Sequence, residues 1–443
     1  MTARRERLLE LDRRLVKVAS SIRVLGALSF PEQAADAFLA CWRRGEPALP
    51  APPEPVPVRA EKLEELATIC REVDREDPLG RFVFDTAVSY RKVASMLASK
   101  GSREFHEVSR DLYGTPKDRL VGTARTHLDA ADHLLESTAL LAHATVVDDV
   151  RTLTPHSVAR ELRKRIARFF VEDKVAVTLD ENLSAKAAAS ASRIRLRSGT
   201  SFTADDVAQL LEHEAFVHSA TALNGKKQPT LTSLSLGSPR TTSTQEGLAT
   251  FAELITGSID LARLRRLALR IRVVHLAEDG ADFIEVFRYL LSVGETENES
   301  VHTALRVFRG GDVRGGHPFT KDVVYLRGLI GVHTFLRKAI AEVRPELVRR
   351  LFVGRLTIGD ALALEEAFDA GDIAPPRYVP EWAENIRGLS AYLAFSMVTS
   401  DIRINDVTMQ DLLDEHGEIA GSLPVPEAPV HEAPVPEAPV SEA

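Results

Sequence analysis

The chain has 443 residues, 44% of them hydrophobic, which is enough to bury a large core without disulfides. Its net charge of −8 argues against a general nucleic-acid-binding protein, and its two cysteines exclude a disulfide framework and a cysteine-rich zinc site. No apolar run approaches the roughly 18 residues of a transmembrane helix, and the N-terminus lacks the apolar core of a secretory signal. We therefore expect a cytoplasmic protein with no membrane span and no nucleic-acid partner.

Residues 1–150 are predicted to form a helical N-terminal region. An apolar stripe recurs there every three or four residues, as on the buried face of an amphipathic helix. Between residues 47 and 58, six prolines predict an extended crossing between helices, because proline cannot sit inside a helix or a central strand. The helical pattern then resumes and breaks near Gly114. The residues of the first stripe are Leu8, Leu11, Leu15 and Val18.

Two short runs after residue 150 have the character of β-strands. They follow a helix with Leu162, Ile166 and Phe170 on its core face. The first run is 175–179, and the second, 193–197, alternates arginine with aliphatic residues. We predict that 193–197 is an edge strand, because charges on one face discourage unwanted pairing.

The next helix carries two histidines, His213 and His218, with Glu214 directly after the first. Thr203 and Asp206 can cap its start. A hydrolytic zinc ion needs three protein ligands, an open position for water and a carboxylate that accepts the water's proton. The histidines could supply two ligands, and Glu214 could be the base.

A second helix, predicted after the polar run 241–244, could complete such a site. Glu246 lies near its start, where the helix dipole favours a carboxylate, and could be the third ligand. Glu253, about two turns on, could orient a ligand histidine, although an exposed carboxylate is an equal alternative.

The spacing of the two histidines makes a geometric demand. At about 100° per residue, an ideal α-helix places His213 and His218 about 140° apart, whereas the histidines of His-Glu-x-x-His are about 40° apart. Either the helix ends near Val217, or a π-bulge with i→i+5 bonding brings His218 back over His213. We predict the bulge.

These motifs resemble those of a known family. The blocks His213 to His218 and Gln245 to Ala249, which reads Gln-Glu-Gly-Leu-Ala, are similar to the tyrosine carboxypeptidase family. That family includes the microtubule-associated tyrosine carboxypeptidases and bacterial proteins named after the QEGLA motif. The similarity runs from about Val175 to Lys338. It also includes the blocks Thr221 to Gly225, Arg306 to Gly310 and Pro318 to Asp322.

The resemblance implies an α+β, predominantly helical fold, with a zincin-like metallopeptidase domain and its small sheet over residues 151–415. In that domain His213, His218 and Glu246 would hold one Zn2+ per chain, with Glu214 as the general base. It also implies a carboxypeptidase that removes a C-terminal residue, tyrosine in the eukaryotic members, from a protein or peptide. The tubulin substrate of those members is not carried over, because the N-terminal region and the tail lie outside the recognised motifs.

A carboxypeptidase must also bind the terminal carboxylate of its substrate, for which a bidentate arginine is the strongest choice. The glycine-rich segment 306–321 contains three arginines and a lysine. We predict that Arg309 and Lys321 form the clamp, with Arg306 behind them. An ordinary connection between helices is an equal alternative for this segment.

Three further residues are candidates for the cleft. Tyr325 could donate a hydrogen bond to a developing oxyanion, although a buried aromatic is the commoner role. Asn224 and Gln228 could line the cleft. His317 lies in the predicted clamp segment, whereas His275, His302 and His333 fall on apolar helical patterns and are expected to be structural.

Helical patterns continue at 259–277, 283–291, 321–341, 361–368 and 386–398. Repeated Pro-Glu-Ala-Pro-Val units then make residues 416–443 a disordered tail, which is best interpreted as a solubilising spacer.

Three functions stay open. The first is a zinc carboxypeptidase. The second is a non-catalytic regulatory or binding protein with a structural metal site, in which Glu214 and His218, four residues apart, could be ligands with His213 elsewhere. The third is a metal-dependent amidase acting on a small molecule. The physiological substrate and the oligomeric state do not follow from the sequence.

Overall fold

The computed structural model describes residues 3–52, 54, 58–142, 152–181, 183 and 186–399. Contacts group Met1–Ser390 into one compact unit and Ala391–Ala443 into a second. The expected tail, residues 416–443, lies outside the described residues, and the division into domains near residue 150 stays a prediction. No helix of the described chain is both long enough and apolar enough to cross a membrane. The expected cytoplasmic location stays a prediction.

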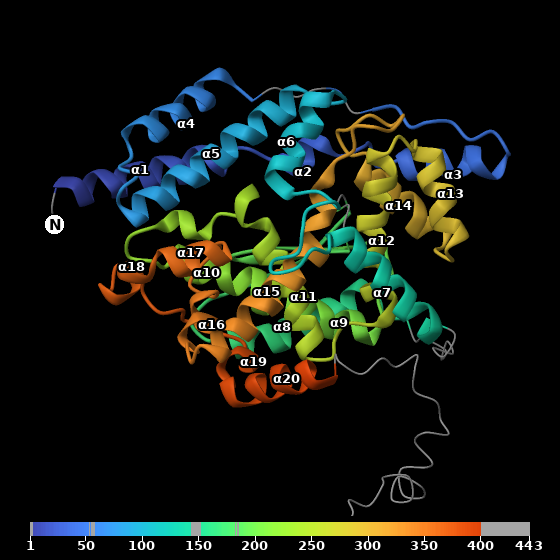
Figure 1. Ribbon diagram of the computed structural model, residues 1–443. Coiled ribbons are helices and arrows are strands. Elements are labelled where there is room, and N and C mark those ends of the chain that lie inside the picture. Colours follow the sequence, from blue (N-terminus) through green and yellow to red (C-terminus); the bar gives the residue numbers. More distant parts are fainter. Residues whose placement is uncertain are drawn as a thin grey trace, which may run out of the picture. The chain divides into compact units, whose positions relative to one another are not determined.

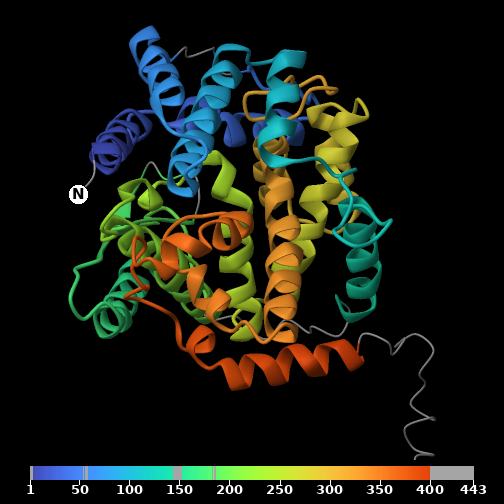
Figure 2. The same cartoon turned by 60° about the vertical axis from the view of Figure 1, so that its left-hand side comes forward.

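The fold is predominantly helical, with a small sheet in the middle of the chain (Figures 1 and 2). The α+β class expected from the sequence is consistent with this. The helices before the sheet are α1 (Ala3–Ala19), α2 (Val24–Leu28), α3 (Ala34–Arg43), α4 (Ala60–Glu72), α5 (Pro78–Ala98), α6 (Arg103–Tyr113), α7 (His127–Ala142) and α8 (Pro155–Phe169).

A π-helix, η1, and three 3-10 helices, η2 to η4, interrupt the α-helices after the sheet. In chain order the elements are α9 (Ala204–Leu210), η1 (Leu211–Ser219), α10 (Ala220–Lys226), η2 (Thr232–Ser235), η3 (Pro239–Thr241), α11 (Thr242–Ile255), α12 (Leu261–Glu278), α13 (Phe283–Ser292), α14 (Glu297–Val307), η4 (Thr320–Val323), α15 (Val324–Ala341), α16 (Glu346–Arg350), α17 (Ile358–Ala363), α18 (Glu365–Asp369), α19 (Glu381–Glu384) and α20 (Ile386–Thr399).

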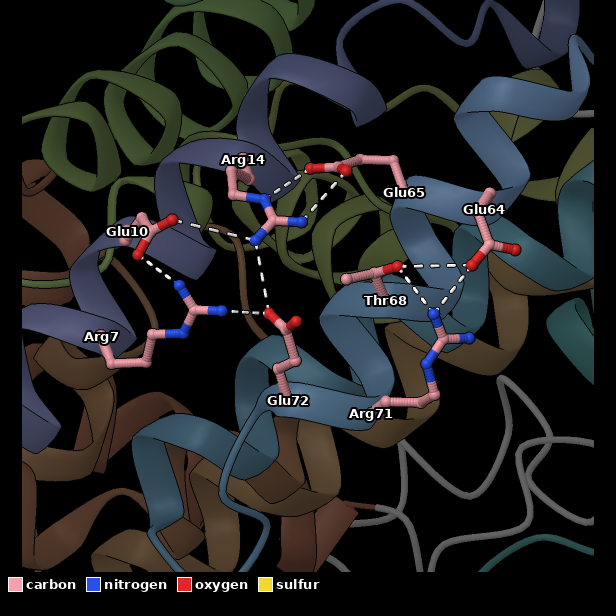
Figure 3. A network of polar contacts seen from close by, with 8 residues as sticks. All are labelled: Arg7, Glu10, Arg14, Glu64, Glu65, Thr68, Arg71 and Glu72. Atoms are coloured by element: carbon pink, nitrogen blue, oxygen red, sulfur yellow. Dashed lines mark hydrogen bonds and ion pairs between the residues drawn. The ribbon is translucent and has the colours of Figure 1, made fainter.

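The first helices follow the predicted pattern. The stripe from Leu8 to Val18 is buried on α1, but this helix ends at Ala19 and α2 is separate. Charged side chains join α1 to α4, as Figure 3 shows. Arg14 donates hydrogen bonds of 2.6 and 3.1 Å to Glu65. Because these side chains are partly exposed, each pair contributes only about 0–1 kcal/mol, and the packing of the apolar stripe contributes more.

The sheet has the strand order β1 (Ala176–Asp180), β3 (Arg193–Arg197), β2 (Ala187–Ser190). β3 pairs parallel with β1 and antiparallel with β2, so the prediction of an edge strand at 193–197 is wrong. The arginines point to an exposed face, while Ile194 and Leu196 are buried. The two edge strands are β1 and β2, and the alanines and serine of β2 carry no β-propensity signal in the sequence.

Helices α11 and α15 pack in direct backbone contact. A Cβ at Gly247 of α11 would lie 2.1 Å from the carbonyl carbon of Gly328 of α15, a distance that no side chain tolerates. Glu246 directly precedes Gly247, and Lys321 lies three residues before the start of α15. The crossing of these two helices therefore sets the distance between Glu246 and Lys321.

Replacing Gly328 with alanine tests this contact. The added Cβ would lie 2.0 Å from the carbonyl oxygen of Ser243, so Gly328→Ala should lower the free energy of unfolding by at least about 1–3 kcal/mol in urea denaturation. Gly331→Ala on the same helix is the control, because its Cβ would meet only a side-chain atom of Ile358 at 3.7 Å. The control should be neutral or up to about 1 kcal/mol stabilising. Equal stabilities of the two variants would contradict the direct contact.

Candidate metal centre

The two motif histidines lie on a π-helix. Residues Leu211–Ser219 form η1 between α9 and α10, so the predicted π-bulge is confirmed and extends over nine residues. Bonding from i to i+5 widens the helix and brings residues five apart onto one face. The rings of His213 and His218 accordingly meet edge to face, with centroids 4.8 Å apart. The capping box of Thr203 and Asp206 that starts α9 is also present.

Glu246 on α11 is the third member of the group. Its Oε2 lies 3.5 Å from Nε2 of His213 and 3.7 Å from Nε2 of His218. One ligand atom from each side chain lies within 4.8 Å of the other two, and among the described residues these three form the group that could hold a metal. Two imidazole nitrogens and one carboxylate oxygen are the donor set of a catalytic zinc site, which keeps a position open for water.

Glu253 lies about two turns beyond Glu246 on α11 and contacts His213. Its Oε1 lies 2.6 Å from Nδ1 of His213, so the imidazole presents Nε2 to Glu246 and His218. Glu253 is itself fully buried, and it accepts hydrogen bonds from Arg263 at 2.6 Å and from Gln209 at 3.1 Å. Glu253 therefore contacts His213 as expected, and its burial excludes the alternative of an exposed carboxylate.

The negative charges of Glu246 and Glu253 favour a positive charge on or beside His213. Burial alone would lower the pKa of His213, but hydrogen bonds to Glu246 and Glu253 outweigh burial and raise it to about 10. Burial would raise the pKa of Glu253, but His213 and Arg263 lower it to about 2. A metal ion coordinated by Nε2 would supply the positive charge that this arrangement otherwise takes from a proton. The residues therefore fit a divalent metal.

Glu214 faces the same group without belonging to it. The side chain is half-buried, and no hydrogen bond or ion pair joins its carboxylate to another residue in the described part of the chain. Its charge acts on His213, Arg263 and Arg355, which places it beside the histidines. An uncommitted carboxylate next to a candidate metal site can act as a base.

Lys321, one of the two predicted clamp residues, lies beside Glu246. Nζ of Lys321 is 3.4 Å from Oε1 of Glu246. Arg309 is half-buried and has no hydrogen bond or ion pair with any described residue; burial and the nearby Arg306 lower its pKa to about 10. Arg309 therefore offers an unoccupied guanidinium. Arg306, in contrast, donates two hydrogen bonds of 2.7 Å to Asp322, so its guanidinium is already paired.

Tyr325 is surrounded by cations. Its hydroxyl accepts a hydrogen bond of 3.3 Å from Arg306, and its ring centroid lies 5.0 Å from the guanidinium of Arg270 and 5.2 Å from Nζ of Lys321. Burial and Glu246 would raise the pKa of Tyr325, but Lys321 and Arg306 outweigh them and lower it. A lower pKa makes the phenol a stronger hydrogen-bond donor.

Asn224 and Gln228 have structural roles, which corrects their prediction as residues of the cleft. Asn224 donates to the carbonyl oxygens of Phe352 and Tyr378, and its own oxygen accepts from two backbone N–H groups. Gln228 likewise binds backbone groups of Val353 and Ala374. Both side chains are buried, and their amide groups are used in joining α10 to these later segments.

Four polar residues around the site were not predicted from the sequence. Arg263 and Arg270 lie on the arginine-rich helix α12, and nothing in the sequence distinguishes them from the other arginines of that helix. Asp322 is almost fully buried between cations, and Arg355 donates a 3.1 Å hydrogen bond to the carbonyl of His218. In each case the partner lies on another element, so the sequence spacing cannot identify the pair.

The family model described as microtubule-associated tyrosine carboxypeptidase matches residues 36–401, which is most of the chain. No curated protein is similar enough to count as a match.

The pair of Arg306 and Asp322 can be tested by Asp322→Asn. Asp322 is 5% exposed, so its loss of charge would leave buried cations unpaired and should destabilise the fold by about 3–5 kcal/mol in urea denaturation. Asp312→Asn is the control in the same segment, because its partner Arg314 is 77% exposed and such pairs contribute only about 0–1 kcal/mol. A loss below about 1 kcal/mol for Asp322→Asn would contradict the structural role of this pair.

Proposed function

The chain belongs to the microtubule-associated tyrosine carboxypeptidase family, and on this premise we propose that it is a zinc-dependent carboxypeptidase that removes a C-terminal residue from a protein or peptide. The observation that carries the proposal is the convergence of His213, His218 and Glu246 beside the uncommitted Glu214. A zincin-like character of the domain and one Zn2+ per chain are parts of the same proposal. Tyrosine, which the family description names, is the first released residue to test.

His213, His218 and Glu246 would hold the zinc ion, which when bound acts as a Lewis acid on water and on the scissile carbonyl. Glu214 would accept a proton from the attacking water and pass it to the leaving amine. Glu253 would keep His213 in the tautomer and orientation that present Nε2 to the site.

The basic side of the site would bind and orient the substrate. Arg309, which has a free guanidinium, would bind the terminal carboxylate in a bidentate manner, with Lys321 as the second cation. Tyr325 would donate its hydroxyl hydrogen bond to the oxygen on which negative charge develops. Arg306 would act through Asp322 and Tyr325, which it holds in place.

A purely structural metal is less favoured. Structural zinc sites usually have four protein ligands, whereas the group of described residues here has three. In addition, a structural site has no use for the unpaired carboxylate of Glu214. Three protein ligands would leave a coordination position for water, and this and the neighbouring carboxylate fit hydrolysis better than a stabilising role.

The role of Glu214 can be separated from metal binding. Glu214→Gln should retain zinc but lower kcat on peptides ending in tyrosine by at least about 100-fold, because a general base contributes about 10²–10⁴-fold. Glu246→Ala should lose both zinc and turnover. Glu212→Gln is the control on the same π-helix and should keep both, since burial, together with Glu381, raises the pKa of Glu212 to about 7 and the charge is not needed. Loss of zinc from Glu214→Gln, with no cleavage by the parent enzyme, would reject the assignment.

The proposed clamp predicts a specific kinetic change. Arg309→Gln should lower kcat/KM by about 10- to 100-fold, the equivalent of about 1.5–3 kcal/mol for hydrogen bonds to a charged group. Arg314→Gln is the control, because Arg314 is 77% exposed and pairs with Asp312. Steady-state kinetics on one peptide series would measure both variants. Unchanged kinetics in Arg309→Gln would assign the carboxylate to another group.

A further inference from the structure

A cavity of about 410 Å3 lies apart from the metal centre. It is lined by residues of α6, of the segment after α6, of the C-terminal end of α12 and of the glycine-rich segment. Arg263 of α12 contacts the metal centre through Glu253, whereas Glu278, fifteen residues later, lines this cavity. At about 1.5 Å per residue, the two sites are separated by roughly 22 Å along the helix.

Some of the charges in this cavity are already paired. Arg103 donates a 2.7 Å hydrogen bond to Glu107, and Lys117 lies 3.2 Å from a carboxylate oxygen of Asp279. The opposite charges within each pair compensate each other. A ligand in the cavity would therefore depend on the remaining groups, which include His106, Arg110 and Glu278.

Glu278 carries a buried carboxylate oxygen that no described residue donates a hydrogen bond to. Its side chain is only 10% exposed, and its buried Oε1 has no hydrogen bond in the described chain. The two nearest cationic or basic groups are too distant for a strong bond: Nε2 of His106 lies at 3.5 Å and Nε of Arg110 at 4.0 Å. A buried carboxylate oxygen without a donor is costly, so a ligand that donates there would be stabilised.

His106 does not donate a hydrogen bond to Glu278. Its Nδ1 lies 2.8 Å from the carbonyl oxygen of Pro318, which only accepts, so Nδ1 carries the hydrogen. Burial lowers the pKa of His106, and the neutral ring therefore presents a bare Nε2 lone pair to Glu278. When Glu278 is ionised, two acceptors therefore face each other, and an ammonium group, with its three N–H donors, can satisfy both.

Arg110 supplies the complementary charge. Its side chain is half-exposed, and among the described residues its guanidinium has an ion pair with Glu278 alone, at 4.0 Å. A ligand that binds both groups must therefore carry an anion next to a cation. In an α-amino acid, the carboxylate and the ammonium are attached to the same carbon atom. This close spacing matches the guanidinium of Arg110 and the carboxylate of Glu278, which lie 4.0 Å apart.

We propose that this cavity binds a free α-amino acid, whose ammonium donates to Glu278 and His106 and whose carboxylate accepts from Arg110. The volume lies within the range of about 300–1,000 Å3 for small-molecule sites. A free amino acid is also what the proposed carboxypeptidase releases, and only this biological reason rests on the proposed function. The site would give the product a binding place away from the metal centre.

The affinity should depend on pH through Glu278. Burial raises the pKa of this carboxyl to about 7, so the ammonium meets mainly a carboxylate above that pH and mainly a neutral carboxyl group below it. Binding should therefore strengthen about tenfold between pH 6 and pH 8. The charged and titratable groups around Glu278 are His106, Arg110, Lys117, Asp118, Asp279 and His317.

Calorimetric titration of the full chain tests the proposal without any need for catalysis. L-tyrosine should bind, whereas tyrosine amide, which lacks the carboxylate, and N-acetyltyrosine, which lacks the ammonium, should bind at least tenfold more weakly. Arg110→Gln and Glu278→Gln should each weaken L-tyrosine by at least tenfold. Arg103→Gln is the control in the same cavity, because its side chain is 81% exposed and paired with Glu107. It should bind like the parent.

Three results would overturn the proposal. One is the absence of heat with L-tyrosine, and another is tight binding of inorganic phosphate in its place. The third is binding that Arg309→Gln abolishes and Arg110→Gln leaves intact, which would place the amino acid at the metal centre. If Glu278→Gln does not fold, the half-exposed Arg110→Gln still decides. A chain that binds L-tyrosine but cleaves no peptide would retain this inference and lose the proposed function.

Discussion

On an ordinary α-helix His213 and His218 would point in different directions, and the whole candidate site depends on the π-helical turn that brings them together. A π-helix is rare because it is less stable than an α-helix, so the surrounding packing must hold it. Ala215 and Val217 are fully buried, and the hydroxyl oxygen of Thr221 lies 2.8 Å from the carbonyl oxygen of Val217. α11 packs against the same turn and brings Glu246 to the two rings.

Buried charges connect the candidate metal ligands to the cluster of cations around Tyr325. Glu253 lies between His213 and Arg263, and Asp322 lies among three cations. Lys321 links the two clusters through Glu246. Because an isolated buried charge is costly, each of these side chains depends on its neighbours for its ionised state. The candidate site is therefore one electrostatic unit, built from η1, α11, α12 and the segment before α15.

Local spacing made part of this site predictable. The five-residue separation of His213 and His218 is incompatible with convergence on an α-helix, so the bulge follows from geometry and a metal hypothesis. Long-range partners did not follow in the same way. The sequence shows that Asn224 has an amide, but not that the backbone of Phe352 and Tyr378 meets it. The strand β2 was missed for a related reason, since its alanines pair only because β3 lies beside them.

X-ray absorption spectroscopy of the zinc-loaded chain tests the central claim most directly, because it counts ligands without relying on turnover. We expect four-coordinate zinc with two imidazole nitrogens and two oxygens, one of them from Glu246, at about 2.0–2.2 Å. One imidazole should disappear in His218→Ala. A zinc ion with a single imidazole in the parent chain, or no stoichiometric zinc at all, would contradict the convergence of His213, His218 and Glu246 on one metal.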